Sequence, residues 1–477
     1  MRKLIPGNIK KTKIIATISN AKCSPDFLRT LYEAGMDLVR MNTAHQTTQE
    51  AIEVISNVRA VSDRIAIMVD TKGPEIRTTP TREDIYVKAG DMINVRGAKD
   101  ELSSRECVCV NYDGLAGDVK VDDWLLVDDG DVGLKVVHKD ADTLTCVVMN
   151  DGSIKGRKGV NIPCVQINLP SLSAKDEEFV RFAADQEVDF IAHSFVRNKE
   201  DVLAVQRILD EKKSPIKIIA KIENQQGVDH IDEILDHAYA VMVARGDLAI
   251  EIPAERIPLI QKKIVRKCIE RRKPVIIATQ MLQSMIHSPR PTRAEVSDVA
   301  NACLDGTDAI MLSGETANGK YPLEAVQVMT RVALEVESGH DTFNDIPYES
   351  DHSVTSYLAK AAVKASMRLH TKALIADTIS GKTILSLAAY RGKNPIYAQC
   401  YSKRVVRELG LSYGVCAHFI QQDLSSHVFL LTALTRLIEE DRFAEESLIT
   451  VLAGHFGSVN GASYIEISSA KNMLHRN

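Results

Sequence analysis

Eight short apolar runs, each closed by a polar or charged residue, dominate the first two thirds of the chain. The runs are continuously apolar, so a strand built from one would be buried on both faces, as in a parallel sheet covered by helices. Segments with helical spacing separate most neighbours. Eight strand–helix units predict a (β/α)8 TIM barrel. The apolar runs span residues 13–18, 37–42, 65–70, 189–195, 217–224, 240–247, 274–281 and 309–315, and helical spacing is clearest at 25–34, 47–62, 199–212 and 254–272.

The regular alternation of strands and helices is interrupted between the third apolar run and the fourth. Residues 80–160 carry short β-like runs separated by Gly and Asp turns, which predicts a small all-β domain inserted into the barrel. After the eighth run a long helical stretch and a polar linker precede four more strand–helix units, the pattern of an open α/β domain. We therefore expect a barrel domain at 1–78 and 160–339, a β-domain at 79–159 and a C-terminal α/β domain at 340–477.

Charge and apolar content exclude several classes of protein. The chain has 59 Lys plus Arg against 64 Asp plus Glu, and this mildly negative balance argues against a general nucleic-acid binder. No run reaches the roughly 18 to 20 apolar residues of a membrane span, and the first residues lack the apolar stretch of a secretory signal. Nine cysteines without a CxxC pair fit neither a disulfide framework nor a zinc module. We expect a cytoplasmic protein.

The active site of such a barrel lies at the carboxyl ends of its strands, where this chain is unusually polar. Lys221 and Glu223 are two residues apart, so on a strand they would project to the same side. Glu223 and Asp247 follow adjacent strands, and two carboxylates completed by water and substrate are a usual set for Mg2+ or Mn2+. The alternative is that each forms a salt bridge at the rim. The remaining polar residues at strand ends include Arg40, Asn42, Asp70, Thr71, Lys72, Arg77, Arg245, Thr279 and Ser313.

The same mouth is cationic. Arg40, Arg77, Lys72 and Lys221 would suit a phosphorylated or polyanionic substrate. Phosphoryl transfer needs its diffuse negative charge neutralised rather than covalent help, and a lysine, arginines and a divalent ion supply that. No GxxxxGK[ST] loop occurs in the sequence.

Two further segments could contact anions. The β-domain turn with Asp129 and the turn with Lys158 would close over the site as a lid, although turns commonly carry such residues. In the C-terminal domain a Ser/Thr-rich loop joins a strand to a helix start, where free N–H groups can bind phosphate. Capping of that helix explains the same residues equally well. The loop residues are Thr378, Ser380, Gly381, Lys382 and Thr383.

Six ordered motifs resemble those of the pyruvate kinase family. The resemblance runs from about residue 11 to about residue 337, with a looser match beyond, and the family shares the three-domain plan predicted above. The motifs are DTKGPEIR at 70–77, KIEN at 221–224, MVARGDL at 242–248, ATQML at 278–282, PRPTRAE at 289–295 and MLSGETA at 311–317.

The resemblance implies phosphoryl transfer from phosphoenolpyruvate to ADP, giving pyruvate and ATP in the last step of glycolysis. Glu223 and Asp247 then match the residues that hold the divalent ion, and Lys221 the one that stabilises the phosphoryl group, with Arg40 and Arg77 as further contacts. Thr279 matches the residue linked to enolate protonation, through water and Ser313. Gly246 and Asp247 match the backbone N–H groups that bind the substrate carboxylate.

The resemblance also implies a nucleotide site, a lid residue and a K+ site. Asn42, His45, Arg77 and Lys158 match nucleotide positions, and Asp129 matches the lid residue. Asn42, Asp70 and Thr71 match K+ ligands, and Glu75 is the residue type that accompanies K+ dependence. Ala44 stands where the family usually has a serine ligand, and residues 19–22 depart from the family's first loop. A homotetramer and a phosphorylated effector at the loop 378–383 are expected by resemblance alone.

Two other functions stay open at this stage. A Mg2+-dependent lyase or aldolase acting on a 2-oxoacid could use the same carboxylates and cation, but would not need the inserted β-domain. A non-catalytic sensor would explain Ala44 and the altered first loop. Retention of Lys221, Glu223, Asp247 and Thr279 favours the kinase.

Overall fold

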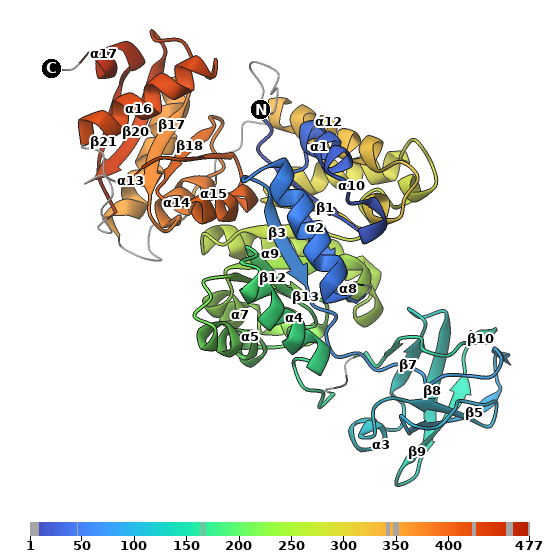
Figure 1. Cartoon of the computed structure of the whole chain (residues 1–477). Helices are drawn as coiled ribbons and strands as arrows, with labels where there is room; N and C mark the ends of the chain where they lie inside the picture. Colours follow the sequence, from blue (N-terminus) through green and yellow to red (C-terminus); the bar gives the residue numbers. More distant parts are fainter. Residues whose placement is uncertain are drawn as a thin grey trace.

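The computed structural model describes residues 9–44, 46–163, 165, 167–339, 344–346, 353–421, 426–454 and 461–475. A barrel lies between an all-β domain and a C-terminal α/β domain (Figure 1). Among the described residues, no helix is both long and apolar enough to cross a membrane.

The eight expected strands close into one parallel barrel in the order β1-β16-β15-β14-β13-β12-β3-β2, which confirms the TIM barrel. Most strands end before the polar residues of the corresponding run, so those residues lie on the loops just beyond the strand ends. The strands are β1 (Lys13–Thr17), β2 (Leu38–Asn42), β3 (Ala66–Asp70), β12 (Phe190–His193), β13 (Lys217–Ile222), β14 (Ala240–Ala244), β15 (Val275–Ala278) and β16 (Ala309–Leu312).

Amphipathic helices cover the outside of the barrel, and several begin at a capping box. Thr292 accepts a hydrogen bond from the Glu295 N–H while the Glu295 carboxylate accepts one from the Thr292 N–H, so the PRPTRAE motif starts a helix. The helices are α1 (Pro25–Ala34), α2 (Thr48–Val61), α4 (Ala174–Asp185), α5 (Lys199–Glu211), α6 (Gln225–Asp229), α7 (Ile231–His237), α8 (Arg245–Glu251), α9 (Ile257–Glu270), α10 (Arg293–Leu304), α11 (Gly314–Ala317) and α12 (Pro322–Gly339), with 3-10 turns η1 (Asn20–Lys22), η2 (Ala254–Arg256) and η3 (Gln283–Ile286).

The inserted domain consists almost entirely of strands. A six-stranded sheet has the order β11-β7-β8-β9-β5-β6, and β10 pairs with β4. Its own apolar core is separate from that of the barrel. The elements are β4 (Ile85–Val87), β5 (Met92–Gly97), β6 (Cys107–Val110), α3 (Leu115–Asp118), β7 (Trp124–Val127), β8 (Val132–Lys139), β9 (Thr143–Val148), β10 (Gly152–Ile154) and β11 (Val160–Asn161).

The C-terminal domain has a five-stranded sheet in the order β19-β18-β17-β20-β21. The four expected strands are parallel, and β21 adds an antiparallel edge that the apolar pattern did not indicate. The elements are α13 (Val354–Arg368), β17 (Leu374–Thr378), α14 (Lys382–Ala389), β18 (Ile396–Cys400), α15 (Lys403–Glu408), η5 (Leu409–Leu411), β19 (Val415–Phe419), α16 (Ser426–Glu439), β20 (Leu448–Gly454), β21 (Ala462–Ser469) and α17 (Ala470–Leu474).

The C-terminal domain closes the base of the barrel. Leu411, from η5, is fully buried within the apolar cluster that fills the barrel interior, alongside Met68, Phe190 and Met311. A layer of side chains inside the barrel therefore includes one from a different domain.

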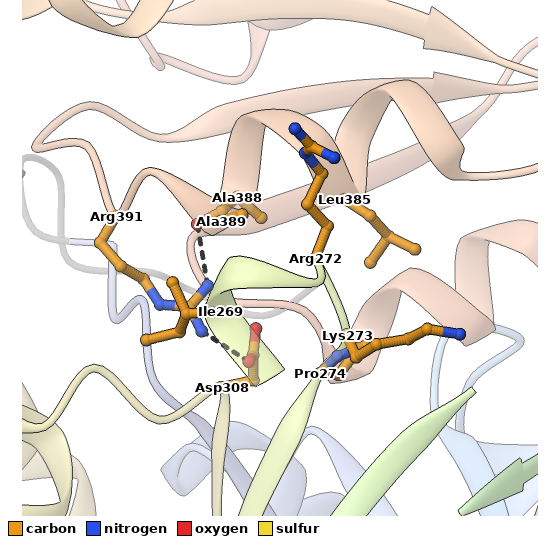
Figure 2. A pocket seen from close by; sticks show the side chains of 9 residues that line it. All are labelled: Ile269, Arg272, Lys273, Pro274, Asp308, Leu385, Ala388, Ala389 and Arg391. Atoms are coloured by element: carbon orange, nitrogen blue, oxygen red, sulfur yellow. Dashed lines mark hydrogen bonds and ion pairs between the residues drawn. The ribbon is translucent and has the colours of Figure 1, made fainter. Parts of the chain in front are cut away.

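A buried ion pair fastens the same junction. Arg391 Nη2 lies 2.6 Å from Asp308 Oδ2 (Figure 2). Arg391 Nε donates to the Gly306 carbonyl at 2.7 Å. Asp308 also accepts hydrogen bonds from the backbone N–H groups of Tyr413 and Val275. Both charges are thus paired and hydrogen-bonded, which is what makes their burial tolerable.

We predict that Arg391→Met destabilises the protein by about 3 to 5 kcal/mol, because it leaves the Asp308 carboxylate buried without its cation. Urea denaturation followed by circular dichroism measures the effect. The control is Arg266→Met, which removes an arginine whose side chain is 82% exposed and pairs with Glu270 on the same helix. Equal denaturation midpoints for the two variants would contradict the prediction.

Candidate active site

Four buried charged side chains, at or just beyond the ends of β2, β3 and β13, meet at the mouth of the barrel. Asp70, at the end of β3, lies between two cations: its Oδ2 is 2.5 Å from Arg40 Nε and its Oδ1 is 3.1 Å from Lys221 Nζ. Lys221 Nζ is also 2.9 Å from Glu223 Oε1. Strand order explains the meeting, because β2, β3, β12 and β13 are consecutive in the barrel.

Burial and pairing shift the protonation of these groups in predictable directions. Burial acts to raise the pKa of Asp70, but Arg40 and Lys221 outweigh it, and the net pKa is lowered. Burial acts to lower the pKa of Lys221, but Asp70 and Glu223 outweigh it, and the net pKa is raised. Pairing with these carboxylates therefore favours the ammonium form of Lys221. Burial raises the pKa of Glu223 more than Lys221 lowers it, and Asp247 adds to the rise.

Glu223 and Asp247 lie near each other but on different kinds of element. Asp247 was expected at a strand end, and it lies instead in the first turn of α8, since β14 ends at Ala244. Asp247 acts on the pKa of both Glu223 and Lys221, which places its charge at the same mouth. Glu223 Oε2 accepts the Phe195 N–H at 2.7 Å, while Glu223 Oε1 lies 2.9 Å from Lys221 Nζ.

The donor set fits a hard divalent ion that keeps oxygen ligands from water or substrate. Within the part of the chain that the structure describes, no group of three or more His, Cys, Asp or Glu could hold a metal. Two carboxylates without a protein cage are consistent with Mg2+ or Mn2+ and inconsistent with a closed zinc site.

Thr279 has a strained backbone. It follows β15, which ends at Ala278, and has φ of 66°, a conformation that is an outlier for a β-branched residue. Arg245 braces the turn: its Nη2 donates to the Thr279 carbonyl at 2.9 Å while its Nη1 is 2.7 Å from Asp298. The Thr279 hydroxyl accepts the Gly246 N–H at 2.7 Å. One of the amides expected to bind a substrate carboxylate is therefore occupied by Thr279 in this structure.

Ser313 follows β16 at the same end of the barrel. Its backbone N–H donates to Glu315 Oε2 at 2.8 Å, while Glu315 Oε1 accepts the Leu282 N–H at 3.0 Å. The buried Glu315 thus ties the loop after β16 to the loop after β15.

Asn42 ends β2, whereas Arg77 and Lys158 lie on two neighbouring segments that pair through the Arg77–Gly159 bridge. Asn42 Oδ1 accepts the Ala44 N–H at 3.1 Å. Arg77 Nε is 2.7 Å from Glu75, and Lys158 Nζ is 2.9 Å from Asp128. His45 lies outside the described residues.

The β-domain turn at Asp129 lies within electrostatic reach of the mouth. Partial desolvation, Asp128 and then Asp247 of the barrel raise the pKa of Asp129, although its side chain remains exposed. Asp128 and Asp129 both have positive φ, so this turn has a left-handed backbone at two consecutive residues.

The C-terminal loop is used as a helix start. Thr378 Oγ1 accepts the Gly381 N–H at 2.8 Å, and Gly381, with φ of 87°, precedes α14. A local turn closed by the Thr378 hydroxyl therefore accounts for Thr378 and Gly381 without a ligand.

Strand-end reasoning missed Ser194 and Phe195, which follow β12. Lys221 Nζ donates to Ser194 Oγ at 2.7 Å, and Phe195 supplies the N–H that holds Glu223. The available signal was the polar end of the run 189–195, directly after the β12 sequence.

Fold and site together define an enzyme of phosphoryl transfer: a TIM barrel whose mouth joins two carboxylates, an ammonium and a guanidinium beside an inserted β-domain. The family model described as "Pyruvate kinase, barrel domain" matches residues 9–326, and the one described as "Pyruvate kinase, alpha/beta domain" matches residues 356–468. The chain belongs to the pyruvate kinase family and is a phosphotransferase.

Similar proteins cover nearly the whole chain. A pyruvate kinase of Borreliella burgdorferi is 44% identical over 471 residues, covering 98% of both chains. One of Bacillus licheniformis is 42% identical, covering 96% of this chain and 80% of the relative. A crystal structure of a pyruvate kinase from Cryptosporidium parvum superposes with a TM-score of 0.91 at 34% identity, covering 98% of this chain and 99% of that one.

Proposed function

We propose that the barrel mouth carries out the family's reaction, phosphoryl transfer from phosphoenolpyruvate to ADP, with Lys221 as the charge that stabilises the group in flight. The observation that carries the proposal is the buried ammonium of Lys221, held between Asp70 and Glu223 at the carboxyl ends of the strands. A transferring phosphoryl group spreads negative charge over its oxygens, and a fixed cation in a water-poor site stabilises that charge strongly.

Glu223 and Asp247 would hold the divalent ion, which when bound neutralises phosphate charge and orients the substrate. Arg40 supplies a second cation, and its ion pair with Asp70 holds the guanidinium in position at the barrel mouth. The pyruvate kinase family generally needs a divalent metal ion and potassium. In this chain Asn42, Asp70 and Thr71 would bind the K+ ion.

Thr279, with Ser313, would supply the proton that converts the enolate to pyruvate through bound water. The Gly246 N–H now donates to the Thr279 hydroxyl, and the substrate carboxylate would compete for that N–H. Substrate binding at Gly246 and Asp247 would therefore remove one partner of the Thr279 oxygen, whose proton now points to the Ala278 carbonyl at 2.7 Å.

The remaining assignments extend the same site. Asn42, His45, Arg77 and Lys158 would contact the nucleotide, and the turn with Asp129 would close over it. We also propose the domain limits of 1–78 with 160–339, 79–159 and 340–477, a cytoplasmic homotetramer, and a phosphorylated effector at Thr378, Ser380, Gly381, Lys382 and Thr383. The lyase and sensor alternatives explain neither the β-domain turn near Asp247 nor the family match over both domains.

We predict that Lys221→Met lowers kcat at least on the order of 100-fold, because it removes one preorganised charge from the transition state. A coupled assay for pyruvate formation from phosphoenolpyruvate, ADP and Mg2+ gives kcat, and circular dichroism checks the fold. Lys267→Met, which removes a lysine paired with Asp232 on the outer helices, is the control and should keep wild-type turnover. Near-normal turnover in Lys221→Met would remove Lys221 from its assigned role.

We also predict that Ala44→Ser strengthens the response to K+, because it adds a hydroxyl oxygen next to Asn42, which already contacts the residue 44 amide. Titrating activity with KCl, with tetramethylammonium chloride keeping ionic strength constant, measures the half-saturating concentration. An unchanged titration would show that the missing hydroxyl does not limit K+ binding.

A further inference from the structure

Ser194 occupies the space between the loops after β3 and β13. Its side chain is almost fully buried at 2% exposure, directly beyond the end of β12. Its hydroxyl contacts three groups of the site: Lys221 Nζ at 2.7 Å, the Thr71 carbonyl at 2.6 Å and Asp70 Oδ1 at 3.3 Å.

The ammonium of Lys221 has three protons, and three protein oxygens lie within hydrogen-bond distance. Two of these belong to the Asp70 and Glu223 carboxylates, and the third is the neutral Ser194 hydroxyl. The serine contact is the shortest of the three. A neutral acceptor fixes direction without adding negative charge, so it does not reduce the positive field that an incoming phosphoryl group meets.

The direction of the Ser194 hydroxyl is itself determined. A hydroxyl has one proton, and the Thr71 carbonyl at 2.6 Å is a closer acceptor than Asp70 Oδ1 at 3.3 Å. With the proton on the side of Thr71, the lone pairs of Ser194 Oγ point toward Lys221.

The backbone around Ser194 leaves it little freedom. The Ser194 N–H donates to Thr71 Oγ1 at 3.1 Å. Gly73, with φ of 75°, packs so closely that a β-carbon there would lie 2.9 Å from Ser194 Cβ and 2.7 Å from a Phe195 ring carbon. Phe195 has φ of 55° and directs its N–H at Glu223 Oε2. One rigid turn thus orients both Lys221 and Glu223.

We propose that Ser194 is a positioning residue for phosphoryl transfer, aiming the Lys221 ammonium when Glu223 turns from Lys221 to the divalent ion. The inference rests on the function proposed above. Because Phe195 holds Glu223 Oε2, the oxygen free to face an ion is Oε1, which now contacts Lys221. Ser194 and Asp70 then remain as the partners that keep the ammonium in place.

The test compares Ser194→Ala and Ser194→Thr, the latter retaining the hydroxyl, in the full-length protein with Mn2+ and K+. We expect Ser194→Ala to lose roughly 10- to 100-fold in kcat, the range typical when a residue that orients the groups of a metal-dependent site is removed. The KM for phosphoenolpyruvate and the Kd for Mn2+, measured without substrate by electron paramagnetic resonance, should stay near wild type. Ser194→Thr should turn over faster than Ser194→Ala.

The matched control is Ser366→Ala, which removes a similarly buried serine hydroxyl that donates to the Val363 carbonyl within α13, away from the site. It should keep wild-type kinetics. Wild-type turnover in Ser194→Ala, equal losses in the alanine and threonine variants, or a loss confined to KM or to Mn2+ affinity would each overturn the inference. If the inference fails in one of these ways, a low kcat for Lys221→Met still supports the proposed function. If the wild-type protein forms no pyruvate, the proposed function itself is refuted.

Discussion

The Asp70 carboxylate, shared by Arg40 and Lys221, is the interaction on which the site depends. Desolvating a cation is costly unless an anion lies against it, and here two cations face two carboxylates, Asp70 and Glu223, in a buried cluster. The cluster is close to neutral on its own. It can therefore exist in a folded protein before any ligand binds, and can accept a metal and a phosphate together without leaving either charge uncompensated.

Three non-glycine residues with a left-handed backbone lie around this cluster. Phe195, Thr279 and Asp129 all have positive φ although none is a glycine, and each lies on a loop that carries or faces the site. Such conformations cost of order 1 to 3 kcal/mol each and persist only where the surroundings fix them. Arg245, anchored on Asp298, does this for Thr279, and the packing of Gly73 does it for Phe195.

The barrel and most of its chemistry could be predicted from local pattern. Apolar runs ending in charge identify Lys221 and Glu223, because the strand period and the barrel topology place strand ends together. The pattern cannot tell a strand end from a helix start, so Asp247 was placed on the wrong element. Ser194 was overlooked because serine is unremarkable at a strand end and its importance comes from Lys221, 27 residues away. β21 was missed because the strand is largely polar and partly exposed, as an edge strand can be.

Leu411 gives the boundary between the barrel and the C-terminal domain an unexpected meaning. The apolar cluster inside the barrel includes this side chain from the C-terminal domain, so the two parts are distinct along the sequence but not in their packing. A chain truncated before the C-terminal domain would lack Leu411, and the apolar side chains at the base of its barrel would be exposed to water. Many α/β chains can lose or exchange their last domain independently. Here the loss of that domain would also remove Leu411 from the barrel interior, so another residue would have to fill its place.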